Sequence, residues 1–476
     1  DQPASLVFVK ALDEGNPDSL VAFRDEVFQL EAPFNERPRS MLKTQNRFSS
    51  IIWGNKNLAI AYDYWWNTRN KKTYLFNPSL SDGGIDLLFD QNYQDVYNDP
   101  GSFITRKNKL GKSVLALKGS RAYLKGDGFS HEGQFPFLDE INLKLKTKKR
   151  LYQSEYKNKF ERFIDYDIMK NQLLVRLESP NDYPNYFIRD FDQGDLKQMT
   201  QFENPFLSIK DIHKEVISYK RADGLELSAT LYLPVGYDKV KKEKMPMILW
   251  AYPREFKDPS SAAQKTSNPN TFTSPYYGSP IYWVTKGYVI LDRASFPILG
   301  VGNTEPNDTF INQLVGNAQA AIDAADSLGY IDRNRVAVGG HSYGAFMVAN
   351  LLSHSDLFAA GIARSGAYNR TLTPFGFQSE QRSYWEAPEI YYNMSPFMHA
   401  DKMKTPLLLT HGEADNNSGT YPMQSIRYFN ALKGLGAKVR LVLLPKESHG
   451  YRAKENILHL LWEQDQWLEK YVKNKD

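Results

Sequence analysis

A β-type apolar run that meets a glycine-rich turn and then a helical pattern is the feature that most restricts the fold. Residues 336–347 read Val-Ala-Val-Gly-Gly-His-Ser-Tyr-Gly-Ala-Phe-Met, and this stretch contains Gly-x-Ser-x-Gly with Ser342 at its centre. Flanking glycines let the backbone pass closely through a sharp strand-to-helix turn that exposes the serine hydroxyl. The helix that follows points its amide groups at the same place and favours a developing negative charge there. The context predicts that Ser342 is a nucleophile rather than an incidental serine in a glycine-rich turn.

Two later loops supply the groups that a nucleophilic serine needs. Such a serine requires a base to take its proton and a third group to fix the tautomer of that base. In an α/β-hydrolase the acid and then the histidine follow the serine along the chain, each on a loop after a strand. Asp415 follows the apolar strand that ends at Thr410, and His449 follows the strand that ends at Leu444. We therefore expect Asp415 to orient His449, and His449 to act as general base and acid.

Other residues compete for these roles. Glu413 could orient the base while Asp415 caps the helix that follows, but Asp415 is favoured because it lies farther beyond the strand. His341 on the elbow and His411 at a strand end are expected to be structural. The sequence has no His-x-x-x-His or His-Glu-x-x-His pair, so no metal site is expected, and the triad chemistry needs no cofactor.

The pattern of expected strands and helices changes near residue 205, which predicts two domains, 1–205 and 206–476. The first part holds short aromatic and β-branched runs that recur every ~40–50 residues, as in four-stranded propeller blades. We expect three to four blade-like units there, with an irregular β-sandwich as the alternative. In the second part apolar strands alternate with helices, which predicts an α/β-hydrolase domain, a mostly parallel sheet with helices on both faces.

The patterns locate individual elements. Strands are expected in the first part at 49–53, 58–65, 72–76, 163–167, 172–177 and 185–190. In the second part we expect strands at 216–220, 225–233, 247–250, 288–291, 358–363, 406–410 and 439–444, besides the one that enters the elbow. Helices are expected after the elbow and at 312–328, 422–432 and 457–472.

Composition excludes several classes of protein. The 476 residues carry a net charge of only +4, which gives no reason to expect a nucleic-acid partner. The absence of cysteine excludes disulfides, thiolate metal sites and a cysteine nucleophile. No apolar run approaches the ~18–20 residues that a membrane span needs. Because the chain opens Asp1-Gln2-Pro3 without methionine, we expect a fragment or a processed product.

Three motifs together resemble one known family. Gly-His-Ser-Tyr-Gly at 340–344, His-Gly-x-x-Asp at 411–415 and Ser-His-Gly at 448–450 are similar to the prolyl oligopeptidase family of serine peptidases, and within it to the glutamyl endopeptidase branch. The stretch 363–374 adds to this likeness. The resemblance covers about residues 205–476. Before residue 205 it rests only on the pattern of short β-type runs. It implies peptide or protein substrates and cleavage through an acyl-enzyme.

The resemblance also assigns the groups around the reacting carbonyl. An oxyanion needs two donors, of which the Tyr343 backbone amide is the first. The second is expected from the loop after 247–250, and the family implies a phenolic hydroxyl there, which Tyr252 matches. The family's P1 pocket is shaped by segments that here contain Arg370 and Asn417. Because a guanidinium forks onto a carboxylate, Arg370 predicts cleavage after Glu or Asp, with a structural ion pair as its alternative role.

The chain departs from the family in its first part. About 205 residues cannot supply seven blades of ~40–45 residues each, so we expect part of the family's closed propeller to lie outside this chain. The paired glutamates that bind a free peptide N-terminus have no visible counterpart, which favours endopeptidase action.

Two rival functions remain open at this point. One is an acyl-peptide hydrolase or esterase on the same triad, and the other is a catalytically silent propeller–hydrolase pair that binds proteins. Leader peptides in the family favour a periplasmic or organellar location. The sequence does not define the oligomeric state.

Overall fold

The computed structural model of the chain describes residues 5–81 and 84–474. The opening Asp1-Gln2-Pro3 therefore lies outside the described residues. The chain forms two compact units. The first contains the residues up to Ser179 together with Tyr183–Glu203, and the second contains Pro180–Asp182 and the residues from Asn204 onward.

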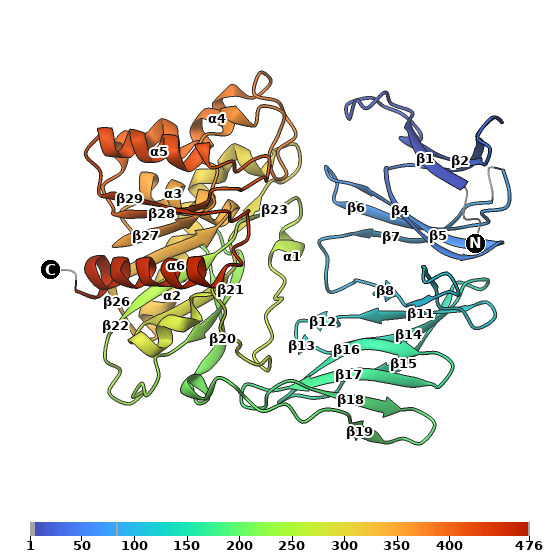
Figure 1. Ribbon diagram of the computed structural model, residues 1–476, viewed down its shortest axis with the longest axis horizontal. Coiled ribbons are helices and arrows are strands. Elements are labelled where there is room, and N and C mark those ends of the chain that lie inside the picture. The colour runs from blue at the N-terminus through green and yellow to red at the C-terminus, as the bar shows by residue number, and fades with distance from the viewer. Residues whose placement is uncertain (1–4, 82–83, 475–476) are drawn as a thin grey trace. The chain divides into compact units, whose positions relative to one another are not determined.

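Antiparallel sheets make up the first unit (Figure 1). The first sheet has β1 (Ser5–Ala11), β2 (Asp25–Glu31) and β3 (Arg39–Thr44), and the second has β4 (Arg47–Asn55), β5 (Leu58–Trp65), β6 (Asn70–Phe76) and β7 (Asp86–Asn92). The third has β8 (Ser102–Phe103), β11 (Arg121–Gly126), β14 (Phe137–Asn142) and β15 (Thr147–Gln153), and the fourth has β16 (Phe160–Asp167), β17 (Gln172–Glu178), β18 (Asn185–Asp190) and β19 (Leu196–Gln198). Two small hairpins are inserted around the third sheet, β9 (Thr105–Lys107) with β10 (Ser113–Leu115), and β12 (Phe129–Ser130) with β13 (Gly133–Gln134).

Successive sheets of the first unit pack face to face through alternate side chains. On β5, Ala59 and Ala61 join the buried cluster shared with the first sheet, whereas Ile60 joins the cluster shared with the third. On β11, Leu124 faces the second sheet, and Tyr123 packs with residues of the fourth. This period-two division between neighbouring four-stranded sheets is the packing of propeller blades. The β-rich prediction for this part, with three to four blade-like units, is confirmed as part of an all-β propeller.

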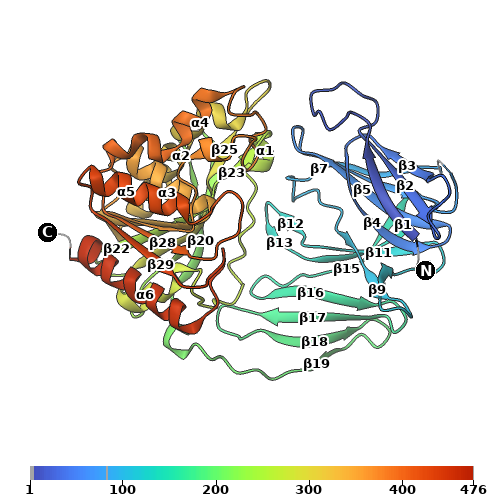
Figure 2. The same ribbon diagram turned by 45° about the horizontal axis from the view of Figure 1, so that its top comes forward.

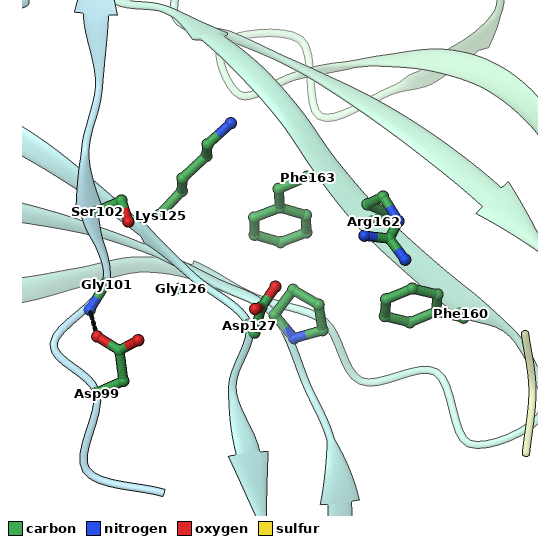
Figure 3. A pocket seen from close by; sticks show the side chains of 10 residues that line it. Asp99, Gly101, Ser102, Lys125, Gly126, Asp127, Phe160, Arg162 and Phe163 are labelled. Carbon is green, nitrogen blue, oxygen red and sulfur yellow. Dashed lines mark hydrogen bonds between the residues drawn. The ribbon is translucent and has the colours of Figure 1, made fainter. Parts of the chain in front are cut away.

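A pocket of about 130 Å³ lies within this first unit (Figure 3). Phe160, Arg162 and Phe163 of β16 line it on one side, and the end of β11 with Lys125 lines it on another. Lys125 Nζ donates to the carbonyl of Ile164, so this ammonium already has a partner. None of the ten residues that line this pocket is a predicted site residue.

One eight-stranded sheet organises the second unit (Figures 1 and 2). Its strands run in the order β20 (Lys214–Lys220), β21 (Glu226–Tyr232), β24 (Val289–Ala294), β22 (Met245–Ala251), β26 (Ile331–His341), β27 (Ala360–Arg364), β28 (Leu407–Gly412) and β29 (Val439–Leu444). The pairs from β24 to β29 are parallel, and β20 and β21 join them antiparallel. A separate parallel pair is formed by β23 (Arg254–Phe256) and β25 (Pro297–Leu299).

Helices cover both faces of this sheet. The α-helices are α1 (Pro259–Ala262), α2 (Phe310–Ser327), α3 (Tyr343–His354), α4 (Pro388–Met394), α5 (Met423–Gly434) and α6 (Lys454–Leu468). Alternate strand residues separate the faces, because Leu407 and Leu409 of β28 pack in the cluster with α2, α3 and α5, whereas Leu408 packs in the cluster with α6. Strands buried on both faces explain the continuous apolar runs in the sequence and confirm the α/β-hydrolase prediction. Among the described residues, no helix is long and apolar enough to cross a membrane.

Candidate active site

Ser342 lies at the junction of β26 and α3, at the carboxyl end of a central parallel strand. Its backbone has φ 59° and ψ −118°, a conformation that residues other than glycine rarely adopt. The turn is tight, since a Cβ on Gly340 would lie 2.4 Å from the carbonyl oxygen of Gly344. The Ser342 amide donates to the carbonyl of Arg364 on β27 at 2.8 Å, which fixes the strained residue to the sheet. The geometry is that of a nucleophile elbow.

Asp415 and His449 meet on the loops that follow β28 and β29. Asp415 Oδ2 lies 2.8 Å from His449 Nδ1, and the Asp415 carboxylate is buried. The Asn417 amide donates to Asp415 Oδ1 at 3.0 Å. The His449 imidazole packs beside the elbow, with its ring centroid 4.8 Å from that of His341. An acid, a histidine and a strained serine therefore gather at the carboxyl edge of the sheet.

The hydrogen bonds that Asp415 accepts decide its ionisation. Burial alone would raise the pKa of the Asp415 carboxyl. Hydrogen bonds from His411, His449 and the Asn417 amide outweigh burial and hold that pKa well below its usual range. Asp415 is therefore a carboxylate at neutral pH, as an orienting acid must be. The competing residue Glu413 is exposed on the same loop, and only its backbone amide, which donates to Leu444, is fixed by the sheet.

Direct hydrogen bonds join the two loops to each other. The Ala414 amide donates to the Glu447 carbonyl at 2.8 Å, and Ser448 Oγ donates to Asn416 Oδ1 at 3.0 Å. A Cβ on Gly412 would lie 2.4 Å from the carbonyl oxygens of both Glu447 and Ser448. Only glycine at the end of β28 lets the two loops approach this closely.

Replacing Gly412 by alanine is expected to lower the free energy of unfolding of the second unit by about 1–3 kcal/mol, the usual cost of overpacking. The measurement is urea denaturation followed by tryptophan fluorescence. Gly434→Ala is the matched control, because a Cβ at Gly434 meets nothing within 4 Å. Equal midpoints for the two variants would contradict the close approach of the loops.

His411 contributes a contact that the sequence did not reveal. Its imidazole is fully buried, and its Nε2 lies 3.1 Å from the same Asp415 Oδ2 that His449 contacts. Thr420 joins this group, with its hydroxyl 3.1 Å from His449 Nδ1. The spacing of four residues between His411 and Asp415 was the available clue, but a strand end followed by a loop hides which residues face each other.

The elements beside the elbow hold the two predicted oxyanion donors. Tyr343 is the first residue of α3, so its backbone amide has no partner within the helix. The Tyr343 side chain is buried, and its hydroxyl donates to Glu255 Oε1 at 2.6 Å. Tyr252 follows β22, and its ring lies edge-on to that of Tyr343 with centroids 5.9 Å apart. Because Tyr252 is 46% exposed, its phenol is accessible to a ligand.

Arg370 follows β27 and is a buried cation that forms no ion pair within the described residues. Its side chain is only 4% exposed, and its Nε has no hydrogen-bond partner. The guanidinium carbon lies 4.2 Å from the ring centroid of Phe346 and 4.5 Å from that of Phe377. Burial lowers the pKa of Arg370 to about 10, so the group stays charged at neutral pH. The guanidinium thus lies among aromatic rings, and the nearby Glu255 carboxylate, which accepts from the Tyr343 hydroxyl, opposes the effect of burial on the pKa of Arg370.

Asn417 lies in the Asp415 loop and is exposed. Its Nδ2 donates to Thr420 Oγ1 at 2.9 Å, so the amide group is already engaged within the loop. No contact between Asn417 and Arg370 is found in the described part of the chain. The two residues assigned to substrate binding therefore differ, since Arg370 Nε has no hydrogen-bond partner whereas the Asn417 side-chain amide has one.

The fold and this arrangement define an α/β-hydrolase preceded by part of a propeller. Residues 313–475 match the family model described as "Prolyl oligopeptidase family". The chain is 43% identical to "Probable glutamyl endopeptidase, chloroplastic" of Oryza sativa subsp. japonica, over 99% of this chain and 52% of that protein. It is 42% identical to the protein of the same description from Arabidopsis thaliana, over 99% of this chain and 51% of that protein. The match to the prolyl oligopeptidase family is thus carried by residues 313–475, and the chain spans about half the length of these curated relatives.

Solved structures share the fold. The acylaminoacyl peptidase of Pyrococcus horikoshii matches with a TM-score of 0.64 and 18% identity, over 100% of this chain and 71% of that one. A putative dipeptidyl aminopeptidase IV from Bacteroides ovatus matches with a TM-score of 0.66 and 15% identity, over 94% and 70% of the two chains. At these identities the likeness concerns the fold alone.

Proposed function

We propose that the chain is a serine-type endopeptidase whose triad is Ser342, Asp415 and His449. The observation that carries this proposal is the 2.8 Å contact between Asp415 Oδ2 and His449 Nδ1 beside a serine with φ 59°. A carboxylate, an imidazole and a serine at an elbow are the parts that acyl transfer requires. The comparisons support this proposal, because two of the relatives named above are described as probable glutamyl endopeptidases.

The proposed reaction proceeds in two stages. Ser342 Oγ attacks the scissile carbonyl carbon while His449 Nε2 takes the hydroxyl proton, and the carbonyl electrons move onto oxygen. The Tyr343 amide and the Tyr252 hydroxyl donate to this oxyanion. The carbon–nitrogen bond then breaks as His449 returns the proton to the leaving amine, and the acyl group stays on Ser342. His449 next activates water, which releases the acid and restores the serine.

Asp415 would keep His449 in the tautomer that accepts the proton of Ser342. Because its carboxylate stays ionised, it accepts from His449 Nδ1–H and leaves Nε2 free to accept the serine proton. It also stabilises the imidazolium that forms during attack.

Arg370 would select glutamate at P1. A carboxylate that replaces water beside this guanidinium gains charge-assisted hydrogen bonds in a bidentate arrangement. The buried Arg370 Nε, which has no hydrogen-bond partner, supports this role over a structural one. Asn417 is the second proposed substrate-binding residue, but its bond to Thr420 makes its part smaller.

A peptide library varied at P1 tests the proposal, using the protein and Ser342→Ala. We expect cuts after Glu that disappear in the variant, with N-terminally blocked peptides cleaved as well as free ones. Cuts after other residues would retain the triad and reject the Arg370 pocket. A reaction confined to esters or to terminal acyl-amino acids would support the rival hydrolase function, and cleavage that survives in Ser342→Ala would reject the triad.

A further inference from the structure

Two histidines share one oxygen of Asp415. Asp415 Oδ2 lies 2.8 Å from Nδ1 of His449 and 3.1 Å from Nε2 of His411. The Thr420 hydroxyl approaches the same oxygen at 3.3 Å, whereas Asp415 Oδ1 accepts from the Asn417 amide. Both carboxylate oxygens are thus occupied by donors.

The partners of His411 fix which of its nitrogens carries hydrogen. Nε2 lies 2.7 Å from the carbonyl oxygen of Thr420, and because a carbonyl only accepts, Nε2 is the protonated nitrogen. Its hydrogen is shared between the Thr420 carbonyl and Asp415 Oδ2. Nδ1 lies 2.6 Å from Ser425 Oγ, so the serine hydroxyl can donate to the lone pair that the neutral imidazole leaves there. Ser425, like His411, is fully buried, and water does not compete for these bonds.

His411 lies on a hydrogen-bonded strand, whereas Asp415 lies on a loop. His411 belongs to β28, where it pairs with Leu443 of β29, and Ser425 belongs to α5. Asp415 lies beyond the strand, held by its own loop and by these side chains. His411 therefore connects a loop carboxylate to both a strand and a helix.

We propose that His411 is a positioning residue for the reaction, which rests on the proposed function. As a donor to Asp415 Oδ2, it holds the carboxylate toward His449 and removes part of the negative charge from the shared oxygen. His449 is thereby kept in one ring orientation, and the proton taken from Ser342 stays on His449. A histidine that only filled space could be replaced by an apolar side chain of similar size without effect on the chemistry.

The test compares His411→Leu, His411→Gln and Ser425→Ala in the full chain, with a peptide that the wild type cleaves. We expect His411→Leu to lower kcat by about 100-fold, as a small misplacement of a catalytic group does, with KM changed less than twofold. The acid limb of kcat/KM should move to higher pH, because Asp415 Oδ2 regains the charge that His411 had withdrawn. His411→Gln should recover most of kcat, since its amide can donate to the same two acceptors. His459→Leu, at an exposed position of α6, is the control for a histidine-to-leucine change.

Several outcomes would overturn the proposal. They are an unchanged acid limb in His411→Leu, equal losses in the leucine and glutamine variants, or a loss that appears in KM alone. If His411→Leu does not fold, Ser425→Ala decides, because freeing Nδ1 should lower kcat and move the acid limb in the same direction, and no change in either would reject the idea. Loss of activity in Ser342→Ala alongside a normal His411→Leu would reject only the role of His411. Activity retained in Ser342→Ala would reject the triad itself.

Discussion

Ser342→Ala is expected to lower kcat/KM for peptide cleavage by roughly 10⁵-fold or more, the scale on which loss of a triad nucleophile acts. The alanine variant keeps the loops of Asp415 and His449, so its circular dichroism and its affinity for a non-cleaved peptide should match the wild type. Steady-state kinetics with a fluorogenic peptide, combined with labelling by a fluorophosphonate, measures the effect. A loss below tenfold, or labelling that persists in the variant, would contradict the assignment of Ser342.

Ser342→Gly is a matched variant that separates chemistry from strain. Both replacements remove the hydroxyl, so both should be inactive. Glycine, however, adopts φ 59° without a steric penalty, and strain of this kind costs of order 1–3 kcal/mol. The glycine variant should therefore show the higher midpoint in urea. If alanine were the more stable of the two, the elbow would not be strained in solution.

Arg370→Ala is expected to reduce the preference for Glu over Gln at P1 by roughly 10²-fold, because truncating one partner of a buried charge pair costs 2–5 kcal/mol or more. Glu and Gln have nearly the same shape, so their ratio cancels any general damage from losing the contacts with Phe346 and Phe377. The measurement is kcat/KM for two peptides that differ only at P1.

Arg370→Lys refines this test. A lysine keeps the charge but lacks the planar fork, so it should restore only part of the Glu preference. A ratio that stays at the wild-type value in Arg370→Ala would remove Arg370 from the P1 pocket. A ratio near one in the wild type itself would reject glutamate specificity and leave the triad intact.

The sequence predicted the architecture of the second unit because its strands are buried on both faces. Runs such as 247–250 and 288–291 contain no charged residue, and the structure has β22 and β24 there. The turn at Ser342 could also be predicted, since a strand, a glycine turn and a helix occur there in direct succession. In the first unit, the β-type runs at 58–65 and 172–177 became β5 and β17.

Contacts across loops could not be derived from the sequence. His411 was expected to be structural, yet its Nε2 lies 3.1 Å from Asp415 Oδ2, because the chain turns back immediately after β28. Whether Arg370 has a partner is also a tertiary property, since it depends on which carboxylates the fold brings near. The aromatic surroundings of Arg370 come from α3 and from the segment around Phe377, which are separate in the sequence.

Because β29 lies at the border of the sheet, we expect it to open locally before the central strands do. β29 pairs with β28 on one side only and carries the loop of His449 at its end, whereas β26, which leads to Ser342, is paired on both sides. Local opening of a border strand requires fewer broken contacts than opening of the centre. A fluctuation that detaches β29 would withdraw His449 from Ser342 while the central strands stay paired, so the proposed activity depends on a border strand.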